Sequence, residues 1–513
     1  MDSGQQRLQE LGYKQELRRN LSAVSNFAFS FAVISILTGV TTLFNTGLTY
    51  GGTISFTWGW FITGFFNLFL GLSMAEICSA FPTSGGLYFW SGELAGRKWK
   101  PFASWITGWF NVVGQWATTC SVNYSLSLLL QVMVLLGTGG GNGGGYLMNK
   151  YVLIGVHGGL ILLQGLINCM PIQYVDFFGL LAVVWNVVGA FVLIILIPSV
   201  AIKRQTASFV FTSFNVPTDL NLPSDPYVFL LGLLMSQYAL AGFDASAHMT
   251  EETKSSDKNG AYGILSSIII AIVVGYAYVL GLSFVVIDPA MLLDSANDAG
   301  GYAVAQLFYQ VFRDRYGNGT GGVLCLGVIA GAVFLCGVSC VISNSRMVYA
   351  FSRDGALPLS RVWHKVNRHE VPINAVWLSC FMAFVMALPS LGSVVAFQAM
   401  VSIATVGLFI SYALPTFFRV TLARGTFVHG PVHLGPRWVS LTVGWVAVLW
   451  VVIITILFCL PVRYPVNSQS LNYTPVAVGG VLVLVLLYWL LSARRWFKGP
   501  QSNLHDPILT DRK

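Results

Sequence analysis

An acidic residue lies deep inside one of the apolar runs of the chain. The run over residues 227–248 ends Tyr238-Ala-Leu-Ala-Gly-Phe-Asp-Ala-Ser-Ala-His248, so Asp244 closely follows Gly242 in a stretch long enough to cross a membrane. A carboxylate in hydrocarbon costs several kcal/mol unless it is paired or solvated. Asp244 therefore caps the second half of an interrupted helix, or faces a bound cation or proton, and the two roles do not exclude each other.

Small and polar residues also interrupt the first apolar run. Ser35, Thr38, Gly39, Thr41 and Thr42 crowd the middle of the stretch from Phe31 to Phe44. Discontinuous helices expose free backbone amides and carbonyls at mid-membrane, where a polar solute or an ion can satisfy them. The amide ends suit a carboxylate, and the carbonyl ends suit an ammonium group. The interrupted runs therefore indicate a site that binds a polar solute.

A polar stripe follows helical spacing in the run over residues 102–136. It consists of Asn111, Gln115 and Thr118 or Thr119, and such a stripe should face the core of a helix bundle. It either contacts a ligand or holds helices together. His157, in the next run, is interpreted as a hydrogen-bonded core residue and not as a proton carrier.

Motifs of enzyme chemistry are absent from the sequence. There is no phosphate-binding Walker motif, zinc-protease helix or nucleophile elbow. The eight cysteines have neither metal-ligand spacing nor a disulfide framework. We therefore expect no catalytic activity, no cofactor and no bound metal.

The elements that must position these residues are membrane-spanning helices. Of the 513 residues, 55% are hydrophobic and only 9% are charged, too few to solvate the surface of a soluble protein of this length. Uncharged runs of about twenty residues mark each crossing. The predicted fold is an all-α membrane protein with about twelve transmembrane helices, near 24–45, 53–77, 102–136, 151–171, 176–200, 227–248, 261–287, 321–345, two within 371–418 broken at Pro389–Ser390, 438–461 and 475–493.

The distribution of Lys and Arg predicts the orientation of these helices. With a cytoplasmic N-terminus, most of the 28 basic residues fall on the cytoplasmic side, as the positive-inside rule requires. The exceptions are Lys150, Lys203, Arg204, Arg313, Arg315 and Arg463. Because the basic residues lie in short loops, the net charge of +8 does not indicate a nucleic-acid partner.

Three long motifs resemble a known transporter family. They are Gly242-Phe-Asp-Ala-Ser-Ala-His-Met-Thr-Glu-Glu-Thr-Lys254 followed by Asn259-Gly-Ala-Tyr-Gly263; Met74-Ala-Glu-Ile-Cys-Ser-Ala-Phe-Pro-Thr-Ser-Gly-Gly-Leu-Tyr-Phe-Trp90; and Ser345-Arg-Met-Val-Tyr-Ala-Phe-Ser-Arg-Asp-Gly-Ala-Leu-Pro358. These segments are similar to the sixth-helix, second-helix and post-eighth-helix motifs of the amino-acid/choline transporter family, within the amino acid–polyamine–organocation superfamily. The likeness extends over essentially all twelve helices.

The resemblance implies a particular architecture. Ten helices should form a five-plus-five inverted repeat of the leucine-transporter type, with discontinuous first and sixth helices and two accessory helices. The expected divisions are a cytoplasmic segment at 1–20, repeats at 21–200 and 227–418, accessory helices at 438–493 and a cytoplasmic tail at 494–513. The central site would lie between the first, third, sixth, eighth and tenth helices.

The same resemblance assigns candidate site residues. In many relatives a Gly-Ser-Gly-Ile-Gly type run holds the substrate carboxylate, and Ser35, Ile36, Leu37, Thr38 and Gly39 match it but keep only its last glycine. The other expected substrate contacts are Gln115, Ala241, Gly242, Phe243 and Asp244, with Phe243 an aromatic gate. At the cytoplasmic rim, Glu76 and Arg346 are expected to form a gate, and Glu93 lies near Arg97 and Lys98 in sequence.

The predicted function is secondary transport of amino acids and related amines such as GABA. The alternatives are a sensor that kept the transporter fold, or a choline or polyamine carrier. The fifth span, Phe177–Ile202, has no lysine where some relatives replace a coupling ion, and Ser339 and Ser343 are a weak sodium signal, so ion-independent exchange fits at least as well. Plasma, Golgi and mitochondrial membranes are not distinguished, and the only other expected partner is the lipid bilayer.

The span order makes a direct prediction about topology. The sequons Asn318-Gly-Thr320 and Asn472-Tyr-Thr474 should lie on the non-cytoplasmic side, whereas Asn20-Leu-Ser22 should never be modified. Labelling of single cysteines at these positions with a membrane-impermeant reagent measures this directly. Labelling of position 318 only from the cytosol would contradict the order of spans.

Overall fold

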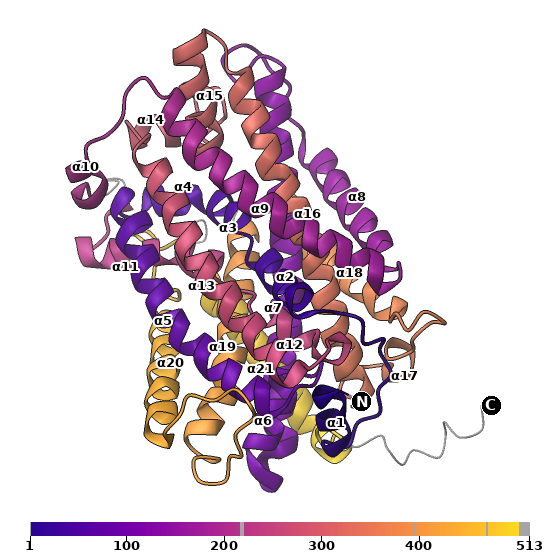
Figure 1. The fold of residues 1–513 in the computed structure, drawn as a ribbon. Helices are drawn as coiled ribbons and strands as arrows, with labels where there is room; N and C mark the ends of the chain where they lie inside the picture. Colours follow the sequence, from indigo (N-terminus) through magenta and orange to yellow (C-terminus); the bar gives the residue numbers. More distant parts are fainter. Residues whose placement is uncertain (1, 216–219, 393–395, 468–469, 502–513) are drawn as a thin grey trace.

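The protein is a bundle of helices in the computed structural model, which describes residues 2–215, 220–392, 396–467 and 470–501. Within these ranges the β-structure is limited to one isolated parallel bridge, between Leu21 and Thr253. The long helices run roughly along one common direction, and short helices lie at both ends and also between the long ones (Figure 1). We call the end with α1, α6 and α17 the terminal face, and the end with α14 and α15 the distal face.

The first part of the chain forms nine helices. They are α1 (Ser3–Glu10), α2 (Ala23–Ile34), α3 (Ile36–Thr42), α4 (Phe44–Thr49), α5 (Thr53–Ala80), α6 (Leu87–Leu94), α7 (Gly96–Gly137), α8 (Lys150–Asn168) and α9 (Ile172–Val200).

The rest of the described chain adds α10 (Ala207–Thr212), α11 (Asp225–Ala239), α12 (Ala245–His248), η2 (Thr250–Glu252), α13 (Ser256–Ser283), α14 (Pro289–Leu293), α15 (Ala303–Tyr316), α16 (Thr320–Arg353), α17 (Ser360–Trp363), α18 (Ile373–Ala387), η3 (Leu388–Leu391), α19 (Ala396–Val420), α20 (Arg437–Leu457), α21 (Thr474–Leu491) and η4 (Ala493–Arg495).

The prediction of about twelve spans in an all-helical membrane protein is confirmed. In the described ranges, 11 helices are long and apolar enough to cross a membrane, and their bounds follow the predicted runs. The predicted sixth span is not among the 11 because α11 ends at Ala239 and α12 begins at Ala245. Neither piece alone reaches the length of a crossing, and together they cover it.

The first span is broken at Ser35, as its small and polar residues predict. Ser35 lies between α2 and α3 with a left-handed backbone at φ 33°, an unusual conformation for a side chain-bearing residue. Its hydroxyl donates to the side-chain oxygen of Asn186 on α9 at 2.9 Å, so the neighbouring helix holds the break in place. Beyond it, a side chain at Gly39 would lie 2.5 Å from the Ala239 backbone, so α3 and α11 approach closely here.

The sixth span is broken over residues 240–244. Gly242 has φ +104°, a backbone conformation that favours glycine, and a Cβ atom there would lie 2.4 Å from the side chain of Val33. Val33 belongs to α2, just before the break at Ser35. The two interruptions therefore meet in the middle of the bundle, and α7, α16 and α19 pack around them.

Candidate functional site

The carboxylate of Asp244 is the centre of a buried polar cluster. Oδ2 accepts hydrogen bonds from Asn111 Nδ2 at 3.1 Å and from Gln115 Nε2 at 3.2 Å, both on α7. Oδ1 accepts from the hydroxyl of Tyr412 on α19 at 2.6 Å, and His248 Nε2 lies 3.3 Å from Oδ2. Asp244 is only 2% exposed. We call these five residues the Asp244 cluster, and it joins three spans around one buried charge.

Tyr412 ties the interruption of the sixth span to α19. Its hydroxyl accepts from the backbone N–H of Gly242 at 3.3 Å while it donates to Asp244. Its ring packs against that of Phe243, with centroids 4.9 Å apart. The unwound stretch thus exchanges the missing helical hydrogen bonds for contacts with a neighbouring span, as a broken membrane helix requires.

Asp244 does not cap α12 with its side chain, although it immediately precedes that helix. Instead, the N–H of Ser246 donates to the hydroxyl of Ser30 at 2.8 Å, and that hydroxyl donates to the carbonyl of Phe243 at 2.9 Å. Because α2 supplies the cap, the carboxylate of Asp244 is left to face α7 and α19. Asp244 therefore does not fill the capping role that was one of the two expected for it, because Ser30 makes that contact.

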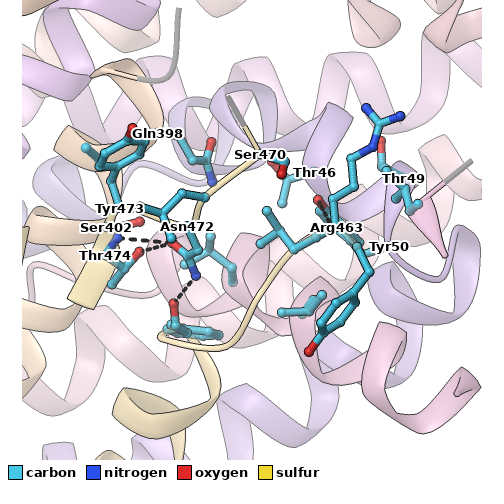
Figure 2. A pocket seen from close by; sticks show the side chains of 18 of the residues that line it. Thr46, Thr49, Tyr50, Gln398, Ser402, Arg463, Ser470, Asn472, Tyr473 and Thr474 are labelled. Carbon is cyan, nitrogen blue, oxygen red and sulfur yellow. Dashed lines mark hydrogen bonds between the residues drawn. The ribbon is translucent and has the colours of Figure 1, made fainter. Parts of the chain in front are cut away.

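A large cavity opens above the cluster toward the distal face. Its volume is about 670 Å³, and its wall combines α4, α11, α19 and the segment that joins α20 to α21. Figure 2 shows Gln398 and Ser402 on one side and Tyr50 and Arg463 on the other. The side chain of Asn472 belongs to the wall itself, because it donates to the carbonyl of Phe458 at 2.7 Å. The cavity is wide enough to admit a small solute.

Two much smaller cavities of about 10 Å³ each continue along the same helices. The first is lined by Thr38, Gly39 and Ala241, among others, and the second by Gln115, Gly242 and Asp244. Successive turns of α19 line all three cavities, from Ser402 through Thr405 to Leu408. A broken path therefore runs from the distal face to the Asp244 cluster.

The structure brings together most of the substrate contacts that the sequence predicts. Thr38, Gly39, Gln115, Ala241, Gly242 and Asp244 line the two small cavities. Phe243 is fully buried against Tyr412, and Ser35 binds Asn186. Ile36 and Leu37 are buried in the apolar core, where Leu37 lies near Gly189 of α9, and neither residue lines the two small cavities.

The two residues expected to form a gate have different partners. Glu76 binds His429 at 3.1 Å and also accepts from the hydroxyl of Ser440. Arg346 forms a buried ion pair with Glu252 at 3.0 Å. The structure therefore does not bring Glu76 and Arg346 together, because the loop between α19 and α20 covers Glu76. Glu93 likewise pairs with Lys100.

Buried ion pairs close the terminal face below the cluster. Arg353, at the end of α16, pairs with both oxygens of Glu251 at 2.9 and 3.0 Å, and Glu251 also accepts from the backbone N–H of Ser84 at 3.0 Å. The next residue, Asp354, accepts from the hydroxyls of Tyr88 at 2.8 Å and Tyr13 at 3.3 Å. These contacts join the ends of three spans below the Asp244 cluster.

Several members of this arrangement escaped the sequence analysis. His248 follows Asp244 by one helical turn, a spacing that could have identified it. Tyr412 and Ser84 are far from Asp244 in sequence, and nothing in their local pattern distinguishes them from packing residues.

Comparison with known proteins places the chain in a family. Residues 21–483 match the amino acid permease family. The chain belongs to that family and is an amino-acid transporter of the multi-pass membrane type.

Two plant proteins are similar to this chain over nearly its whole length. It is 61% identical to the amino-acid permease BAT1 of Arabidopsis thaliana, covering 98% of this chain and 97% of the relative. It is 63% identical to the BAT1 homolog of Oryza sativa subsp. japonica, covering 98% and 96%. The GABA-specific permease of Saccharomyces cerevisiae is 30% identical, covering 99% and 87%. The three sequence motifs predicted this membership, and it is confirmed. Within the family, the motifs most resemble those of the plant bidirectional amino-acid transporter, also called GABA permease.

Gly242 offers a direct test of the interruption in the sixth span. In Gly242→Ala, the added methyl group must fit at φ +104° and against Val33, so the two breaks should be pushed apart. We expect amino-acid transport to fall at least about tenfold, because a displacement of about 1 Å at a site of this kind can cost up to about a hundredfold. Radiolabelled uptake, normalised to protein inserted in the membrane, measures the effect.

The matched control is Gly317→Ala. Gly317 also has a positive φ, +76°, but a Cβ atom there would meet nothing within 4 Å. This variant should transport like the wild type, so the control separates backbone strain from the contact with Val33. Wild-type transport by Gly242→Ala would show that the close approach of the breaks is not required.

The buried carboxyl group of Asp354 should make the stability of the folded protein depend on pH. This carboxyl lies outside the spans, and burial raises its pKa to about 6. Between about pH 4 and pH 6 the folded protein then holds a proton that the unfolded chain has lost, so stability falls as the pH rises through this window. Asp354→Asn should weaken this dependence and raise the thermal midpoint by a few degrees above pH 6. Thermal unfolding in detergent, with the exposed Asp314→Asn as control, tests this; an unchanged pH profile would contradict it.

Proposed function

We propose that this permease moves zwitterionic and cationic amino acids, and related amines such as GABA, by alternating access and in either direction. The observation that carries the proposal is the position of the Asp244 cluster, beneath a cavity open to one face and above ion pairs that close the other. A carrier requires a binding site that reaches one side of the membrane at a time.

The two interruptions supply complementary chemistry for an amino acid. The substrate ammonium would lie near the carboxylate of Asp244, which adjoins the small cavity with Gln115 and Gly242. The substrate carboxylate would lie near the backbone of Ser35, Ile36, Leu37, Thr38 and Gly39, where the start of α3 offers unpaired amides. Ala241 and Phe243 complete the proposed site, with Phe243 moving as the gate.

The substrate range should be broader than one small α-amino acid. The first break keeps only one of the glycines that make a tight carboxylate cradle in many relatives. The chain is also 30% identical to a protein named for GABA. In GABA the amino group lies farther from the carboxylate than it does in an α-amino acid. Both observations support a site that accepts different separations of the two charged groups.

The proposal includes the arrangement of the chain in its membrane. We assign residues 21–200 and 227–418 to two inverted five-helix repeats, because the broken spans are then the first helix of each. Residues 438–493 are the two accessory helices, and residues 1–20 and 494–513 are cytoplasmic, of which residue 1 and residues 502–513 lie outside the described residues. The terminal face is thus the cytoplasmic face, and Glu251, Arg353, Glu252 and Arg346 form the closure on that side, in place of a direct Glu76–Arg346 gate.

Counterflow in proteoliposomes tests this function. Purified protein should exchange internal unlabelled alanine, GABA, glutamate, lysine or arginine for external labelled amino acid without an ion gradient. Absence of exchange for every amine-bearing solute would contradict the carrier and favour a sensor. Exchange of choline or a polyamine, without amino acids, would change the substrate class instead.

Asp244→Asn tests the proposed contact with the substrate ammonium. Asparagine keeps the size of the side chain and removes its charge, so lysine and arginine exchange should weaken at least about tenfold and alanine exchange less, since a buried charged hydrogen bond contributes about 1.5–3 kcal/mol. The control is Glu93→Gln, which removes a carboxylate from a partly exposed pair with Lys100. Such surface pairs contribute little, and this variant should keep wild-type rates. Wild-type exchange of alanine, lysine and arginine by Asp244→Asn would contradict this contact.

A further inference from the structure

Both ring nitrogens of His248 face oxygen atoms that accept hydrogen bonds. Nδ1 lies 3.0 Å from the backbone carbonyl oxygen of Ser84, which has no proton to give. Nε2 lies 3.3 Å from Oδ2 of Asp244. A neutral imidazole carries one N–H and can satisfy only one of these contacts, whereas a protonated ring carries two. The ring is completely buried, so water does not supply the missing donor.

The other contacts of Asp244 decide where this proton lies. Three further donors point at its carboxylate: the side-chain amides of Asn111 and Gln115 and the hydroxyl of Tyr412. The orientation of the Tyr412 hydroxyl is fixed, because it accepts from the N–H of Gly242 and must therefore donate to Asp244. A carboxyl group surrounded by donors is held as the anion. The atom of the pair left to carry a proton is thus Nε2 of His248.

We propose that the Asp244–His248 pair is a proton-binding site that links the movement of zwitterionic amino acids to the movement of one proton. The proposal rests on the carrier function above and adds its coupling ion. His248 binds the proton through Nε2 beside Asp244, and the site is complete when the terminal face is closed. No redox partner is needed: an N–H bond forms on one side of the membrane and breaks on the other.

The Ser84 carbonyl makes proton binding depend on the conformation. The N–H of Ser84 is clamped by Glu251, which is held by Arg353, so this carbonyl reaches His248 only while the terminal face is closed. Opening that face removes the acceptor of the Nδ1–H and admits water. The protonated ring is therefore favoured in the closed state, and by linkage a proton on His248 favours closure. Release to the terminal side follows opening.

The groups around the pair come from four elements. Tyr412 of α19 and Cys340 of α16 are the titratable side chains on the cavity side, where Cys340 lines the same small cavity as Asp244. Asn111 and Gln115 of α7 are neutral donors. Beyond Ser84, Glu251 and Arg353 pair with each other, so their charges largely offset as seen from His248. In this arrangement a protonated His248 is the ionic partner of Asp244.

The experiment measures alanine movement and proton movement together in proteoliposomes at zero membrane potential. With the outside more acidic by about one pH unit, the wild type should accumulate alanine up to about tenfold, because that gradient can sustain this ratio at one proton per alanine. An entrapped pH-sensitive dye should report acidification that requires external alanine. In His248→Gln, which cannot carry the proton, the accumulation ratio should fall to about one.

His157→Gln is the matched control, since His157 is also a buried histidine in a span but packs against Tyr124 and Phe384, away from the cluster. It should accumulate alanine like the wild type. If His248→Gln does not insert and fold, His248→Asn replaces it.

Two results would overturn the proton site while leaving the carrier intact: wild-type counterflow without accumulation or dye response, and wild-type accumulation by a folded His248 variant. Absence of counterflow in the wild type would instead overturn the proposed function, and the proton site with it.

Discussion

The free energy needed to keep one carboxylate inside a membrane protein shapes the centre of this structure. Asp244 is 2% exposed, and an ion removed from water at this depth is tolerated only with an ionic partner and hydrogen bonds. The chain provides the hydrogen bonds, and places the imidazole of His248 beside the carboxylate, by breaking the sixth span, so that residues of α7, α12 and α19 can reach it. The broken backbone is in turn satisfied by Tyr412 and Ser30. The interruption and the charge thus stabilise each other.

The two ends of the bundle differ in how tightly they are closed. Above the Asp244 cluster the walls separate into a cavity of about 670 Å³, and below it the ends of the spans are joined by buried ion pairs. Buried pairs of this kind contribute little net stability when they form, and breaking one without hydrating its charges is costly. They suit a closure that opens only when water enters.

The sequence predicted the fold more completely than the site. Charge depletion and uncharged runs locate helices because hydrocarbon excludes charge over a fixed thickness, and this held even for the broken sixth span. Gly242 and Asp244 were identifiable because each breaks a local rule of membrane helices. Tyr412, Ser84 and the partners of Glu76 and Arg346 were not, since their roles arise from contacts between residues more than 90 positions apart in the chain. Local spacing carries no information about such contacts.

The bridge between Leu21 and Thr253 has a consequence for how the protein is made. The segment before α2 is held in place by backbone hydrogen bonds to residues that follow the sixth span. During synthesis those residues do not exist until nearly half of the chain has been translated. The N-terminal segment therefore stays undocked until the sixth span and the residues that follow it have been made. The closure at this face is therefore completed late in assembly, because it requires contacts between the N-terminal segment and residues that follow the sixth span.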